Sequence, residues 1–163
     1  MSLITEDGSL VSGAESYISV ADADSFFAGI GKTAWAAMSA IKKEQSLRKA
    51  TSYLELKYFG TWKGLRISSE QTLSWPRLGV IVDRFPVASN VIPPEIKVAC
   101  AKLALRASAE ELMPDLERKT VRETVGPITE EYDPHSTQSK TFPEIPALLR
   151  PYLSFTNGIL LVR

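Results

Sequence analysis

The chain has very few of the residues on which active sites usually depend. Its 163 residues include one cysteine, Cys100, and one histidine, His135. A single thiol forms no disulfide or cysteine-rich metal site within the chain, and Cys100 lies in the apolar run 98–101, where it is predicted to be a small buried side chain. A catalytic triad needs a positioned imidazole, whereas His135 lies in a predicted loop over 133–143. We therefore predict no catalytic residue, no cofactor and no metal, so the protein is not expected to be an enzyme.

An excess of charge and a long apolar run are also missing. Nineteen basic residues balance nineteen acidic ones, whereas a protein that coats nucleic acid usually has a basic excess; a local basic patch remains open. No apolar run approaches the roughly 20 residues that cross a bilayer, and the first residues lack the pattern of a signal peptide. We expect no membrane contact and synthesis in the cytoplasm. The length suits one domain with its own core.

Three amphipathic helices are predicted. Ser19 begins the first, which ends at Gly29 or Gly31, because serine caps a helix start and glycine accepts the conformation after its end. The second spans about 40–58 after Ser39, and the third runs from Pro93 to the region of 113. The third is apolar on nearly all sides, which is typical of a central helix or of one covered by a neighbouring subunit. The predicted fold class is mainly α, a small helical bundle.

A β-hairpin arm and an extended C-terminal tail complete the predicted fold. Alternating β-branched residues flank a Gly-Pro break within about 119–132, which predicts a hairpin. An isolated hairpin is marginally stable, so we expect it to contact the body or another chain. The tail, 155–163, follows a short predicted helix over 144–153 and should dock on its own domain or on a partner because exposed aliphatic residues are costly. We divide the chain into a domain, 1–154, and a docking tail, 155–163. The expected subunit-interface residues are Val121, Val125, Ile128 and Tyr132, and the expected docking residues are Phe155, Ile159, Leu160, Leu161 and Val162.

The segment 59–92 joins the second and third helices and is unusually long for a connection inside a compact domain. It interleaves aromatic and cationic residues, of which the candidates for nucleic-acid contact are Trp62, Lys63, Arg66, Trp75 and Arg77. Proteins that bind single strands stack bases on rings and bind phosphates with cations. The other interpretation is that both tryptophans fasten the segment to the bundle while the cations stay in solvent. We favour the second, because stacking platforms usually lie on β-sheets and little sheet is predicted here.

Several motifs, in order along most of the chain, resemble a family of bacteriophage and prophage proteins described as DnaT-like and single-stranded-DNA-binding. The motifs are LITEDG (3–8), SYISVADAD (16–24), LRKATSYL (47–54), GTWKG (60–64), LSWPR (73–77), IPPEIK (92–97), VGPITEEY (125–132) and LLRP (148–151). The tail residues 159–163 have no place in this pattern. The resemblance implies an alternative function, a single-stranded DNA-binding replication accessory protein.

The layout also resembles the head–tail connector, or adaptor, proteins of tailed phages. That resemblance implies a structural virion protein that forms a dodecameric ring beneath the portal, extends the DNA channel and joins the tail. The implied partners are further copies of the chain, the portal protein, a tail or tail-completion protein and the DNA passing through. The expected location is the head–tail interface of the virion, after assembly in the host cytoplasm. Ring contacts would cover the third helix, the hairpin and the tail, so we favour this function.

Overall fold

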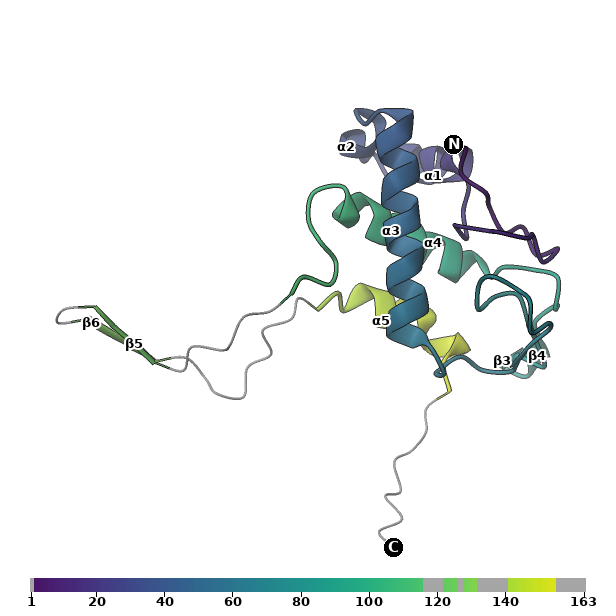
Figure 1. Ribbon diagram of the computed structural model, residues 1–163. Coiled ribbons are helices and arrows are strands. Elements are labelled where there is room, and N and C mark those ends of the chain that lie inside the picture. Colours follow the sequence, from purple (N-terminus) through teal and green to yellow (C-terminus); the bar gives the residue numbers. More distant parts are fainter. Residues whose placement is uncertain (1, 116–121, 126–127, 132–140, 155–163) are drawn as a thin grey trace, which may run out of the picture.

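The computed structural model describes residues 2–115, 122–125, 128–131 and 141–154. Figure 1 shows helices packed around a long central pair, with small antiparallel strand pairs. This architecture confirms a mainly α protein with a β-hairpin. The elements are α1 (Val20–Gly29), α2 (Thr33–Ala36), α3 (Ala40–Tyr58), β1 (Leu65–Arg66), β2 (Arg77–Leu78), β3 (Ile81–Val82), β4 (Phe85–Pro86), α4 (Pro94–Ala107), β5 (Arg122–Val125), β6 (Ile128–Glu131), α5 (Glu144–Leu149) and the 3₁₀ helix η1 (Arg150–Tyr152).

The helix starts follow the predicted caps. The Ser19 hydroxyl accepts a hydrogen bond from the Asp22 amide at 3.0 Å, and the Ser39 hydroxyl accepts one from the Lys42 amide at 3.3 Å. Each bond satisfies an amide that has no partner within the first turn. The third predicted helix, α4, ends at Ala107 rather than near residue 113, because the chain turns there and the amides of residues 109 and 110 both donate to the carbonyl of residue 106.

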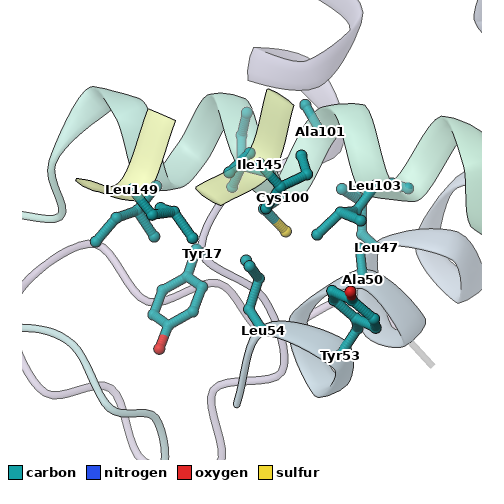
Figure 2. Packing of buried hydrophobic residues seen from close by; sticks show 14 of the residues in the cluster. Tyr17, Leu47, Ala50, Tyr53, Leu54, Cys100, Ala101, Leu103, Ile145 and Leu149 are labelled. Atoms are coloured by element: carbon teal, nitrogen blue, oxygen red, sulfur yellow. The ribbon is translucent and has the colours of Figure 1, made fainter. Parts of the chain in front are cut away.

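The core lies where α3 crosses α4 (Figure 1). Figure 2 shows side chains of both helices meeting there, with Leu54 of α3 and Leu103 of α4 completely buried. Cys100 lies among them, with its Sγ 3.2 Å from Thr51 Oγ1. Burial raises the pKa of this thiol above its ordinary value. The prediction of a small buried cysteine is confirmed.

Helix α4 is largely covered within this chain. It packs against α1, α3 and α5, and its apolar circumference is buried within the chain: Ile96, Ala99, Cys100, Ala101, Leu103 and Ala104. Of the two explanations for its apolar pattern, the structure therefore supports the central helix. A neighbouring subunit is not needed to cover it, which removes one of the reasons for favouring a ring.

The predicted hairpin forms from β5 and β6, with Val125 opposite Ile128 in the register. Two other residues assigned to a subunit interface, Val121 and Tyr132, lie outside the described residues. The predicted docking tail lies outside them too, with Phe155, Ile159, Leu160, Leu161 and Val162. Within the described part of the chain, no helix has the length and apolar character needed to cross a membrane.

Candidate nucleic-acid interface

Both tryptophans of the segment 59–92 belong to the core. Trp62 is 5% exposed and Trp75 is fully buried. The two rings meet edge-on with centroids 5.9 Å apart, and Trp75 meets the ring of Tyr152 in the same way at 5.6 Å. Neither indole N–H has a hydrogen-bond partner among the described residues. In this structure neither ring has a face open to a nucleobase, and the burial of both rings supports the fastening role.

Two of the candidate cations also hold the segment in shape. The Arg77 guanidinium donates to the carbonyl oxygens of Lys63 and Gly64, each at 2.7 Å, and to that of Ser74 at 3.2 Å. Burial lowers its pKa somewhat from the ordinary arginine value. Lys63 Nζ donates to the Pro151 carbonyl at 2.8 Å. The guanidinium of Arg77 is therefore occupied by bonds that stabilise the fold. The last candidate, Arg66, is exposed and donates to the Gln71 carbonyl.

A buried polar network fixes the segment to α3. Glu55 accepts from the Tyr17 hydroxyl through one carboxylate oxygen, and from the Ser74 amide at 3.1 Å and hydroxyl at 2.7 Å through the other. The Trp75 amide donates to the Tyr17 oxygen at 3.3 Å. Burial raises the pKa of Tyr17 well above its ordinary value, so the phenol stays neutral and keeps its proton for Glu55. Three distant parts of the sequence therefore meet at one carboxylate.

The C-terminal part of the described chain holds the same segment from the other side. The Lys63 amide donates to the Tyr152 carbonyl at 2.8 Å, and the Ser154 amide donates to the Thr61 carbonyl at 2.7 Å. The Tyr152 hydroxyl donates to a carboxylate oxygen of Glu95, in α4, at 2.6 Å. The inner side of the segment 59–92, which faces the helices, is therefore occupied by contacts with the rest of the protein.

The outer side of the segment 59–92, which faces solvent, carries the strand pair β1–β2. This pair was not predicted from the sequence. Leu65 lies opposite Leu78 in the register, and both side chains are exposed, by 71% and 55%. Gly64 makes this pairing possible: its φ is +69°, and a Cβ atom there would lie 2.3 Å from the Leu78 carbonyl oxygen. Only glycine combines that conformation with such close approach. The β1–β2 pair therefore exposes two leucines that lie opposite each other, and the exposed Arg66 is the next residue of the strand after Leu65.

The β3–β4 hairpin follows directly. Its base is anchored by Val80, which is fully buried, and by the Val87 amide, which donates to the Val80 carbonyl at 2.9 Å. Asp83 and Arg84 form its two-residue turn with φ angles of 50° and 71°. Two positive φ values define a type I′ turn. Arginine is an unusual choice, since a side chain in the left-handed region costs about 1 kcal/mol or more.

We use the term hairpin surface for the exposed side chains of these two strand pairs taken together. It combines cationic, aliphatic and aromatic side chains: Leu65, Arg66, Leu78, Ile81, Arg84 and Phe85. Residues 59–92 contain one lysine and three arginines against one aspartate and one glutamate, a net charge of +2 (4 − 2) in a chain whose total is zero. In Figure 1, β3 and β4 lie toward the C-terminal end of α3, and α1 and α2 lie at its opposite end. The segment that carries the two strand pairs therefore has a small basic excess, which the sequence analysis had left open.

Arg84 and Phe85 were not among the residues proposed from the sequence. The candidates predicted from the sequence were grouped around the tryptophans, whose large apolar area favours burial. The available signal was the alternation of valines at 80, 82 and 87 around an Asp-Arg pair, which is the pattern of a short hairpin with one anchored side.

Comparison with known proteins gives one match. A family model described as "Putative DnaT-like ssDNA binding protein" matches residues 1–163. No curated protein matches the chain. No solved structure matches it either.

The match overturns the function that the sequence analysis favoured. A virion head–tail connector, in a dodecameric ring beneath a portal, is wrong, because the family that covers the whole chain is described by single-stranded DNA binding. The match supports the alternative function instead. The absence of catalytic activity stays a prediction.

Proposed function

Because the chain belongs to the family of DnaT-like single-stranded-DNA-binding proteins, we propose that it binds single-stranded DNA through its hairpin surface. The family match over residues 1–163 carries this proposal. The structure supports the location, because the hairpin surface combines exposed cations with exposed apolar side chains on a rigidly held base.

The chemistry follows from the two kinds of side chain. Arg66 and Arg84 bind phosphates, since guanidinium groups form charge-assisted hydrogen bonds to phosphate oxygens. Leu65 and Leu78 give the bases an apolar surface, and only a single strand has base faces free to contact it. A duplex satisfies the phosphate contacts alone, so the surface favours the single strand.

Binding is expected to be salt-sensitive and tolerant of sequence. Each phosphate neutralised on a single strand contributes about −0.7 to the slope of log affinity against log salt concentration. With a local charge of +2 on residues 59–92, the slope should be shallow compared with that of strongly basic proteins. Contacts to phosphate and to base faces carry no base code, so oligonucleotides of different sequence should bind similarly. The protein would hold the strand as an accessory protein without changing it chemically.

Fluorescence anisotropy of a labelled thymine oligonucleotide, titrated with the full chain at low salt, tests this proposal. The key variant is the double substitution Arg66→Gln and Arg84→Gln. The matched control is Lys32→Gln with Lys42→Gln, which also removes two exposed cations, but near the α1–α2 end. We expect saturable binding that weakens with salt, exceeds binding to a duplex, and is lost mainly in the arginine variant. Absence of binding by the wild type at low salt, or equal loss in both variants, would overturn the proposal.

A further inference from the structure

The side chains of the β3–β4 hairpin differ in how far they are buried. Val80, Val82 and Val87 pack against the core, whereas Ile81, Arg84 and Phe85 are exposed. In the register Phe85 lies opposite Val82 and Ile81 lies opposite Pro86, so Phe85 shares a face of the hairpin with Val82 and Ile81 lies on the other face. The base of the hairpin is buried, and Arg84 and Phe85 are exposed because they lie at its tip. Its strands contribute only two residues each, so the exposed residues sit next to the turn, close to the anchored base, with little freedom to move as a loop would.

Phe85 is one of two aromatic rings that are more than half exposed among the described residues. It is 75% exposed, and Phe59, at the end of α3, is 76% exposed. All the described tryptophans and tyrosines are buried. The core therefore gains almost nothing from the Phe85 ring, and the ring is available to a flat apolar ligand.

Arg84 places a cation directly before this ring. The turn position that it occupies, with φ of 71°, suits glycine better than arginine. The hairpin would form more easily with glycine, so the arginine is not explained by the turn. Because Arg84 and Phe85 are adjacent in the chain, the guanidinium and the ring extend from neighbouring positions at the tip of the hairpin. A ring and a cation on adjacent residues match the base and the phosphate of one nucleotide.

We propose that the tip of the β3–β4 hairpin is a base-stacking element: the Phe85 ring stacks on one unpaired base, and the Arg84 guanidinium binds an adjacent phosphate. This inference rests on the proposed function and adds the ligand contact that gives preference for a single strand. The ligand is any nucleotide of single-stranded DNA, because every base has a face on which a ring can stack.

Phe85→Ala measures the stacking, with Phe59→Ala as the matched control because it removes an equally exposed phenyl ring at a different place. Each variant is titrated against a thymine oligonucleotide and against an abasic oligonucleotide of the same length. Stacking on one base predicts that Phe85→Ala weakens binding to the thymine strand roughly fivefold or more. The abasic strand should bind the wild type and Phe85→Ala equally, and Phe85→Tyr should keep the wild-type affinity.

Arg84→Gly measures the phosphate contact without damage to the turn, because glycine accepts positive φ freely. We expect an unchanged or higher stability, weaker binding, and a salt slope reduced by about 0.7. This inference is wrong if the wild type binds single-stranded DNA and Phe85→Ala binds it as tightly. It is also wrong if Phe85→Ala loses as much affinity for the abasic strand as for the thymine strand. In both cases the proposed function stands. If the wild type does not bind at all, the proposed function itself fails.

Discussion

The indole ring of Trp75 lies edge-on against that of Trp62, with the ring centroids 5.9 Å apart and the planes at 89°. Both rings come from the segment between α3 and α4, yet both lie in the core. The segment therefore has a buried inner side, to which these rings belong, and the exposed side chains of the hairpin surface.

Removing the Trp75 ring should strongly destabilise the protein. The side chain is fully buried between Trp62 and Tyr152, and truncation of a buried tryptophan to alanine typically costs about 3–5 kcal/mol. Urea unfolding of Trp75→Ala measures this loss. Phe59→Ala, at a ring that is mostly exposed, should stay within about 0.5 kcal/mol of the wild type. Equal stability of both variants would show that the segment is not fastened by its tryptophans.

Glu55 should stabilise the fold through the three donors that it accepts. In Glu55→Ala the Tyr17 hydroxyl and the Ser74 amide and hydroxyl lose their acceptor, and leaving buried polar groups without partners costs about 1–3 kcal/mol. Ser74→Ala should cost less, because the Ser74 amide keeps its bond. A double-mutant cycle of the two substitutions, followed by urea unfolding, should give a clear coupling energy. Additive effects would mean that the network is not formed in solution.

Gly64→Ala should disturb the β1–β2 pair. The new Cβ atom would lie 2.3 Å from the Leu78 carbonyl oxygen and 2.8 Å from Val80 Cγ2, at a φ of +69°. Both the clash and the left-handed backbone disfavour alanine. We expect lower stability in thermal unfolding together with weaker DNA binding, since Leu65 and Leu78 would be displaced. Gly29→Ala, where the added atom meets nothing within 4 Å, serves as the control, and a Gly64→Ala protein as stable as that control would contradict the close approach.

The stability should fall in alkaline solution as buried tyrosines ionise. Burial raises the pKa of Tyr58 to about 12, and it also raises the pKa values of Tyr17 and Tyr53 above their ordinary value. The contribution of Tyr58 is complete below about pH 10, where the phenol is neutral in both states. Between about pH 10 and 12 the unfolded phenol loses its proton while the folded one keeps it, so the free energy of unfolding decreases as the pH rises.

Urea unfolding at a series of pH values, with Tyr58→Phe alongside the wild type, checks this dependence. The variant has no ionisable group at position 58, so its stability should decline less steeply over the same interval. Identical slopes for the two proteins would show that Tyr58 titrates alike in the folded and unfolded states.

The helical body could be predicted from the sequence because its signals are local. Ser19 and Ser39 each cap a helix in the way that their spacing to the next residues predicts, and the apolar pattern of α4 indicated a helix that is covered on nearly all sides. The short helix α2 was missed, since four residues do not show a period. The apolar pattern of α4 could not show whether this chain or a neighbouring subunit covers the helix. A sequence pattern shows that a face is apolar but not what packs against it.

The candidate site was harder to predict because aromatic and cationic residues serve both folding and binding. The sequence placed Trp75 and Arg77 near each other but not their partners: the ring packs on Tyr152, and the guanidinium binds the carbonyl oxygens of residues 63, 64 and 74. The contact with Tyr152 joins positions far apart in the chain, and the bonds to residues 63 and 64 depend on how the segment folds. Phe85 gave a weaker signal than either tryptophan, although it is the ring that stays exposed.

Nuclear magnetic resonance mapping of a bound oligonucleotide tests the central claim most directly, because the 18.0 kDa chain is small enough for assigned amide spectra. A thymine oligonucleotide is added at low salt to the labelled protein, and the shifted amides are placed on the fold. We predict shifts concentrated in β1–β4 and the turn at Arg84, reversed by added salt, with α1 and α2 unchanged. Absence of shifts, or shifts gathered at the α1–α2 end, would contradict single-stranded DNA binding by the hairpin surface.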